Sequence, residues 1–157
     1  MHKKMGFAIV SIVLLFAAVL MADTMPQKGD DPDASPPVTK ADLKIVQRAR
    51  EILGDPSKWN RADTRDCPDD AKTFSLYCSL EKATKEVTGG FQHRGAAMQE
   101  ARFVIDEIAP NRQKYHHRLM DYNNDPSTTF HDIQKVFDLV ENRITKRLRD
   151  ESPRANH

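Results

Sequence analysis

The stretch DYNNDPSTTFHDIQKVFDLVENRITKRL, residues 121–148, contains the longest helical pattern in the chain. Thr129 and Asp132 stand three residues apart, as in a capping box, so a helix is expected to begin there. Residues 124–126, Asn-Asp-Pro, predict a turn just before it, because Asn and Asp bond their own backbone and Pro presets φ. We therefore interpret the polar cluster at residues 127–132 as the start of a helix. Apolar residues then recur on one helix face: Ile133, Val136, Phe137, Val140, Ile144 and Leu148.

Apolar periodicity and helix stop signals predict further helices on the N-terminal side of this stretch. One spans residues 39–54, with a capping-box pair at its start and a glycine at its end. Others are expected from near Pro68 to Gly89, from Gln92 to Ala109, and over a short segment at residues 112–121. The predicted fold class is all-α, a small bundle of four to five helices. Because each segment is too short to be stable alone, one shared core is expected. Its members are Leu43, Val46, Ile52, Phe74, Leu80, Val104, Ile108, Ile133, Val136, Phe137 and Val140.

The N-terminus carries the most specific signal in the chain. Lys3 and Lys4 precede residues 5–22, MGFAIVSIVLLFAAVLMA, which contain no charge. An apolar region of about 7–15 residues suits a cleaved secretory signal, whereas about 17–25 residues span a bilayer. Residues 1–22 are therefore predicted to be either a signal peptide cleaved near Ala22 or a signal anchor that contacts the membrane. By the positive-inside rule, the rest of the chain is exported to the periplasm or another extracytoplasmic space.

Composition divides the remaining chain into three parts. Residues 23–37 are rich in Pro, Asp, Gly and Ser, so we expect a disordered linker that cannot form a core. Beside an uncleaved anchor, this linker would reach up to about 50 Å from the membrane. Residues 38–148 form the predicted helical domain, and residues 149–157 a disordered tail.

The charge balance gives no indication of a broad basic face for nucleic acid. The chain has 24 Lys+Arg against 23 Asp+Glu, and two of the lysines belong to the leader. His116 and His117 are adjacent, so on a helix they would point about 100° apart and could not chelate one metal at i, i+4 spacing. No other His or Cys stands at metal-ligand spacing. We therefore expect no metal site and no cofactor.

Three short motifs follow one another along the predicted domain. They are Trp59-Asn60, YCSLEKA at residues 77–83, and Tyr122-Asn123-Asn124 ahead of the amphipathic helix. Their order and spacing resemble an uncharacterised family of short bacterial and phage proteins, which shows W-C, then W-C-A-L-G-A-L, then W-N-D. This chain has Asn60 in place of the first cysteine, Glu81 in place of the glycine, and tyrosines in place of two tryptophans. The resemblance implies an all-helical domain and no assigned activity. Its motif residues here are Trp59, Tyr77, Cys78, Tyr122, Asn123 and Asn124.

Cys67 and Cys78 are the two cysteines of the chain. In an exported protein, an even pair favours a disulfide. If one unbroken helix joined them, eleven residues at ~1.5 Å each would separate them by about 16 Å, whereas a disulfide needs Cα atoms within roughly 7 Å. A bridge therefore requires residues 67–70, CPDD, to fold back against the helix. A buried unbridged Cys78 and a reactive thiol stay open as alternatives.

Trp59 is the sole tryptophan and lies in a polar stretch between two predicted helices. A large ring in such a stretch is expected to hold the loop against a helix. We predict that it packs on the second helix near Tyr77 or Cys78.

Two function classes fit these observations. The first is a non-catalytic binding or interaction module of the cell envelope, whose partner would be an unknown envelope protein or surface component. The alternative is a small, hydrolase-like envelope enzyme that uses the Asn123–Asp125 turn with His131 as a base. Residues 146–149, KRLR, are interpreted as cations that suit a helix C-terminus, with contact to an anionic envelope component as the alternative.

Overall fold

The computed structural model describes residue 34 and residues 36–151. The predicted leader, residues 1–22, lies outside this part of the chain. The described residues form five α-helices and two short 3₁₀-helices, with no β-strand among them, so the all-α prediction is confirmed. No helix in the described part is long and apolar enough to cross a membrane. In chain order, the elements are α1 (Lys40–Ile52), η1 (Pro56–Lys58), α2 (Leu76–Thr88), α3 (Ala96–Ile108), η2 (Arg112–Lys114), α4 (Arg118–Asn124) and α5 (Phe130–Glu151).

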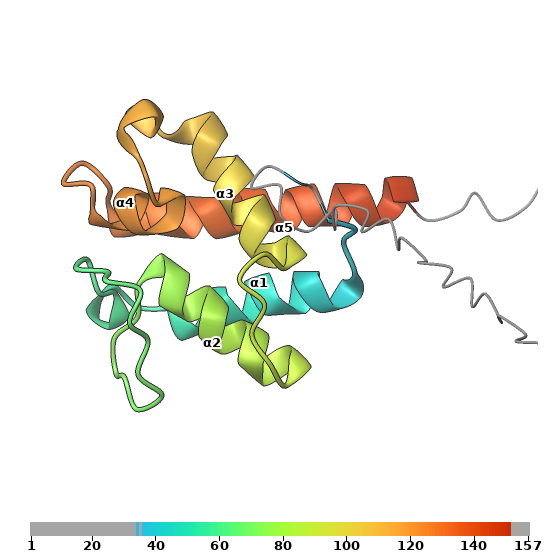
Figure 1. The fold of residues 1–157 in the computed structure, drawn as a ribbon, viewed down its shortest axis with the longest axis horizontal. Helices are drawn as coiled ribbons and strands as arrows, with labels where there is room; N and C mark the ends of the chain where they lie inside the picture. The colour runs from blue at the N-terminus through green and yellow to red at the C-terminus, as the bar shows by residue number, and fades with distance from the viewer. Residues whose placement is uncertain (1–33, 35, 152–157) are drawn as a thin grey trace, which may run out of the picture.

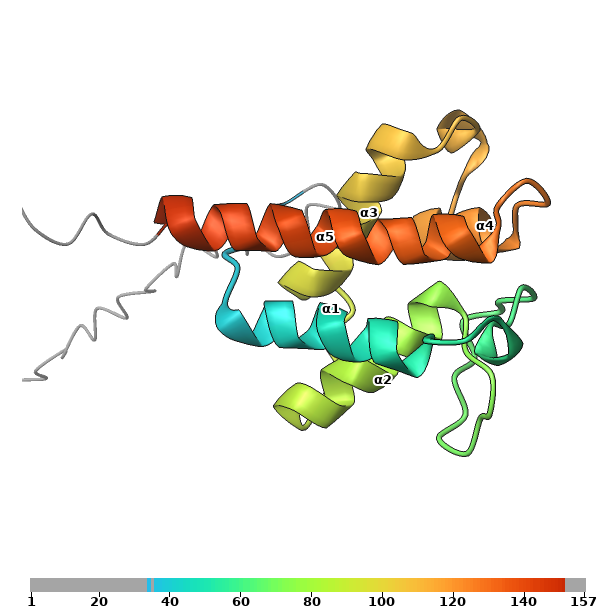
Figure 2. The same ribbon diagram turned by 180° about the vertical axis from the view of Figure 1, so that it is seen from behind.

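The helices pack in two layers around one core. Helices α1 and α5 lie side by side and run in opposite directions (Figures 1 and 2). Behind them, α2 packs across α1 and α3 packs across α5, while the short α4 lies at the end where α5 begins (Figure 2). The two ends of the described chain lie close together near the C-terminal end of α5. There, an Arg147 guanidinium N–H donates to the Pro36 carbonyl at 2.9 Å.

The predicted core is buried in large part. Phe137 is 1% exposed, at the centre of the stripe of α5. Leu43, Phe74 and Ile108 are only half-buried, and they pack at the edge of the core. The other predicted members are all buried: Val46, Ile52, Leu80, Val104, Ile133, Val136 and Val140.

Both predicted capping boxes are present. At the start of α1, the Thr39 backbone N–H donates to Asp42 Oδ2 at 2.8 Å. At the start of α5, Thr129 N–H donates to Asp132 Oδ2 at 2.8 Å, and Asp132 N–H donates to Thr129 Oγ1 at 3.2 Å. These bonds satisfy backbone donors that have no partner inside a helix. The polar cluster at residues 127–132 therefore does start a helix.

The boundaries of α2 and α3 differ from the sequence prediction. Helix α2 begins at Leu76 rather than near Pro68, because Ser75 caps it by accepting the Cys78 N–H at 3.0 Å. Residues 67–70 belong to the preceding loop instead. Helix α3 begins at Ala96, four residues later than predicted.

The C-terminal elements also differ from the prediction. The predicted short helix at residues 112–121 is divided into η2 and α4. Helix α4 continues to Asn124, so Asn123 and Asn124 occupy its last turn rather than the following loop. Helix α5 continues to Glu151, three residues beyond the predicted domain boundary at 148.

A buried carboxylate links α3 to α5. Glu100 is 0% exposed and forms ion pairs with Arg143 and Arg147, which lie one turn apart on α5. Arg143 also pairs with Glu107, and Arg147 with Glu151. Arg147, which belongs to the KRLR stretch, thus has its partners within the fold. We call Glu100, Arg143 and Arg147 the Glu100 triad.

Candidate functional site

The motif residues around position 123 meet in a saturated hydrogen-bond network. Asn123 is 0% exposed, and its Oδ1 accepts the Trp59 indole N–H at 2.8 Å and the Leu76 backbone N–H at 3.0 Å. Its Nδ2 donates to the Asn60 carbonyl at 2.9 Å and to Asn124 Oδ1 at 3.1 Å. An asparagine amide has two donor hydrogens and two acceptor sites, so all four are used. Asn123 has no hydrogen-bonding capacity left for a ligand.

Asn124 extends this network to the next part of the loop. Its Nδ2 donates to the Asp63 carbonyl at 2.8 Å, and its Oδ1 accepts the Asp63 N–H at 2.8 Å. Asp63 is buried, and its Oδ1 accepts the Arg65 N–H at 2.7 Å. Asn123 and Asn124, called the asparagine network below, therefore fasten the loop at residues 59–65 to α4.

The predicted position of Trp59 is wrong. Its ring lies 6.1 Å from that of Phe130, at the start of α5, with the Arg61 guanidinium 5.0 Å from the ring centre. The backbone of Trp59 pairs with that of Phe74, where Asn60 N–H donates to the Phe74 carbonyl at 2.9 Å, and the indole N–H donates to Asn123 of α4. Trp59 therefore holds the loop to the α4–α5 junction, not to Tyr77 or Cys78.

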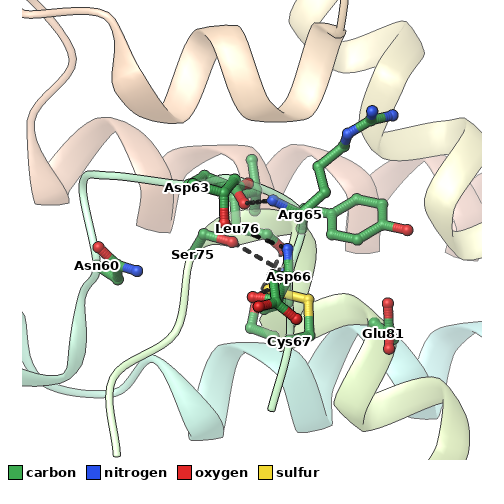
Figure 3. The surroundings of a disulfide bond; sticks show 12 residues. Asn60, Asp63, Arg65, Asp66, Cys67, Ser75, Leu76 and Glu81 are labelled. Atoms are coloured by element: carbon green, nitrogen blue, oxygen red, sulfur yellow. Dashed lines mark hydrogen bonds between the residues drawn. A yellow bond between two sulfur atoms is a disulfide. The ribbon is translucent and has the colours of Figure 1, made fainter. Parts of the chain in front are cut away.

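Cys67 and Cys78 form a disulfide, with their Cα atoms 5.4 Å apart (Figure 3). The late start of α2 permits it, since the residues after Cys67 are in a loop that returns to the helix. Arg65 lies two residues before Cys67 at a left-handed φ of 63°, and its side chain extends away from the disulfide (Figure 3). The asparagine network and the disulfide thus hold the chain on both sides of Arg65.

The residues of the enzyme alternative are not assembled into one cavity. His131 is exposed in the first turn of α5, and the amide of Asn123 is saturated. The Asp125 carboxylate accepts hydrogen bonds from Ser127 and Tyr115, and the Ser127 donors lower the pKa of Asp125 to about 2. Asp125 therefore holds its own turn together. No cluster of three or more metal-ligating side chains occurs in the described part of the chain.

A cationic cavity of about 230 Å³ lies where α2, α3 and the start of α4 meet. Five arginines and three histidines line it, and no Asp or Glu is among the described residues of its wall. We call it the arginine cavity. The lining residues are Arg65, Tyr77, His93, Arg94, Gln99, Arg102, Arg112, His116, His117, Arg118, Leu119 and Met120.

Arg102 of α3 is a half-buried guanidinium of this cavity that bonds only neutral groups. It donates to Gln99 Oε1 at 3.1 Å and to the His93 carbonyl at 3.0 Å, and it contacts His93 Nε2 at 3.2 Å. Because a guanidinium can only donate, Nε2 accepts, and Nδ1 of the neutral ring donates to the Tyr77 hydroxyl, 3.3 Å away. Burial, with a smaller contribution from the nearby charge of Arg118, lowers the pKa of Arg102 to about 10.

Two other arginines of the cavity share one carboxylate. Arg112 and Arg118 both pair with Asp106 of α3, the latter at 3.2 Å. Arg102 and Arg65 have no carboxylate partner among the described residues. Burial and the charge of Arg102 also lower the pKa of His93. Arg65 and Arg102 therefore bring positive charge to the cavity that no carboxylate of the described part of the chain pairs with.

The arginine cavity was not predicted from the sequence. Its arginines come from two loops, from α3 and α4, and from η2, so no motif in the sequence unites them. The near-neutral charge of the whole chain also concealed a local excess of positive charge. A usable signal was the density of arginine and histidine at residues 93–118, where the sequence was used to predict helices and to exclude a metal pair at His116 and His117.

The model of a family of unknown function (DUF6197) matches residues 37–143. The chain belongs to this family. No curated protein and no solved structure matches the chain. The DUF6197 region runs from just before α1 into α5, so it includes both the asparagine network and the arginine cavity. The expected membership of an uncharacterised family is confirmed, while the assignment of individual motif residues stays a prediction.

Proposed function

We propose that this protein is an exported, non-catalytic binding protein whose DUF6197 domain holds a small anionic ligand in the arginine cavity. The observation that carries the proposal is the environment of Arg102: a half-buried guanidinium, hydrogen-bonded to neutral groups only, in a wall rich in cations. A buried charge without a counter-charge is costly. An anion that enters the cavity would remove this cost and would gain charge-assisted hydrogen bonds.

The arrangement of His93 supports binding rather than catalysis. Both of its ring nitrogens are engaged, one by Arg102 and the other by Tyr77. It therefore has no open nitrogen at which to accept a proton from a substrate or from water. The arginines around it are donors that remain charged and do not exchange protons near neutral pH.

Thermal unfolding of the full-length protein in a nonionic detergent tests the proposal. Millimolar sulfate, added at constant ionic strength, should raise the melting temperature, because a ligand that binds only the folded state stabilises it. Arg102→Gln should abolish most of this shift. Arg50→Gln is the matched control, since Arg50 pairs with Asp138 on the surface, outside the cavity. Equal shifts in the wild type and Arg102→Gln would contradict the proposal.

Export is the second part of the proposal, and it is supported by Lys3, Lys4 and the uncharged residues 5–22. Residues 1–40, fused to a reporter that is active only outside the cytoplasm, should give signal. Fractionation then distinguishes an anchor from a signal cleaved near Ala22. A soluble cytoplasmic product would contradict both forms.

A further inference from the structure

We infer that the ligand class of the arginine cavity is a small phosphomonoester, a phosphate group that carries a few carbon atoms. This inference rests on the proposed function and specifies its ligand. Three features of the cavity support it: the positive charge without a carboxylate partner, the separate elements that carry the donors, and the volume of the cavity.

The uncompensated charge favours a dianion. Arg65 and Arg102 have no carboxylate partner in the described part of the chain, whereas Arg112 and Arg118 both pair with Asp106. A carboxylate ligand neutralises one positive charge. A phosphomonoester carries about −1.5 to −2 at pH 7, so it matches the excess better.

The donors approach the cavity from separate parts of the fold. Arg65 comes from the loop before the disulfide, Arg102 from α3, and Arg118 from the first turn of α4. A planar carboxylate is satisfied by one guanidinium fork. Donors from separate elements can each contact a different oxygen of a tetrahedral group with three terminal oxygens, which a phosphomonoester presents and a phosphodiester does not.

The volume and the remaining lining residues suit a short carbon chain. The cavity has about 230 Å³, below the roughly 300–1,000 Å³ of clefts that hold drug-sized ligands. Leu119 and Met120 offer apolar contacts, and Tyr77 is also part of the wall. These groups fit a few carbons with a hydroxyl attached.

Isothermal titration calorimetry on the full-length protein in nonionic detergent tests this inference. The probes are glycerol 3-phosphate, inorganic phosphate, glycerate, and vesicles that contain phosphatidylglycerol. Glycerol 3-phosphate should bind about ten-fold or more tightly than glycerate, its carboxylate counterpart, and more tightly than inorganic phosphate. Arg65→Gln and Arg102→Gln should each weaken its binding about ten-fold or more, while Arg50→Gln should not. Circular dichroism establishes that each variant is folded.

The possible outcomes separate this inference from the proposed function. Glycerate or inorganic phosphate could bind as tightly as glycerol 3-phosphate, with Arg102→Gln weakening the binding of each ligand. The inferred ligand class would then be wrong, but the proposed anion binding would be supported. If only the vesicles bind, in an Arg102-dependent way, the ligand is a phosphodiester headgroup and the inference is overturned. If no probe binds the wild type more tightly than Arg102→Gln, the inference and the proposed function both fail.

Discussion

Glu100 and Arg102 stand two residues apart on α3, in opposite electrostatic surroundings. Glu100 is fully buried between Arg143 and Arg147 of α5, so its charge is compensated within the fold. Arg102 lies on another side of the helix, since two residues turn an α-helix by about 200°. It contacts Gln99 and His93 and no carboxylate among the described residues.

The two groups of arginines show that residue type alone does not define a role. In the Glu100 triad, arginine side chains join two helices around a buried carboxylate. In the arginine cavity, Arg65 and Arg102 have no carboxylate partner among the described residues, and we propose that a ligand supplies the negative charge. The triad is therefore expected to determine stability, and the cavity is expected to determine binding.

Removing the buried carboxylate should have the largest effect on stability. Glu100→Gln leaves Arg143 and Arg147 without their shared partner, so unfolding free energy should fall by about 3–5 kcal/mol. Chemical denaturation measures the loss. Glu107→Gln is the control, because the Glu107 side chain is 61% exposed and should contribute less than ~1 kcal/mol. A loss below about 1 kcal/mol for Glu100→Gln would remove the distinction between the two groups.

Removing the disulfide should have the next largest effect, and it should reduce both the stability of the fold and anion binding. The paired replacement of Cys67 and Cys78 by serine frees a loop whose ends are 11 residues apart, at a cost of roughly 2–3 kcal/mol. It should also reduce the sulfate-induced shift in melting temperature, because Arg65 lies two residues before Cys67 and the disulfide holds that side of its loop. In wild type without reductant, both thiols should resist alkylation. Rapid alkylation of Cys67 in the native protein would show that the bridge is absent.

Removing the uncompensated charge should change stability little. Arg102→Gln deletes a half-buried guanidinium that has no carboxylate partner, so the unfolding free energy should stay within about 1 kcal/mol of wild type without ligand. Arg147→Gln, the matched change in the Glu100 triad, should cost more. Denaturant unfolding of both variants under identical conditions tests the contrast. A larger loss for Arg102→Gln than for Arg147→Gln would reverse it.

The smallest expected effect is a dependence on pH through His93. Its pKa lies below 6.5 in the folded protein, because burial and the charge of Arg102 disfavour the protonated ring. The unfolded chain therefore binds the proton more readily than the folded protein does. The free energy of unfolding is highest above pH 6.5 and decreases as pH falls from there through the lowered pKa of His93. The charged groups that act on His93 are Arg102, Arg65, Arg94 and Glu81.

Melting temperatures from about pH 8 to 5, with and without saturating sulfate, measure this effect. Sulfate should reduce the loss at low pH, because an anion in the cavity favours the protonated ring. His93→Asn should remove the difference between the two curves. An identical pH dependence in wild type and His93→Asn would show that His93 does not contribute.

Local patterns were sufficient to predict the helices and much of the core. The stripe of α5, from Ile133 to Ile144, follows directly from helical spacing, and the Thr39 and Thr129 caps depend on residues three positions away. The start of α2 could not be predicted in the same way. Pro68 suits a helix start, but the disulfide and the Phe74 pairing keep that segment in a loop.

The sequence by itself determined the fold class, the family and an expectation of export, because these depend on composition, spacing and short-range signals. Only the tertiary structure decided which charges are compensated. Asp106, four residues after Arg102, would be its natural partner on an isolated helix, yet it pairs with Arg112 and Arg118. Ion pairing depends on which side chains reach a carboxylate in space, and the packing of α3 against α4 leaves Arg102 facing the cavity without a counter-charge among the described residues.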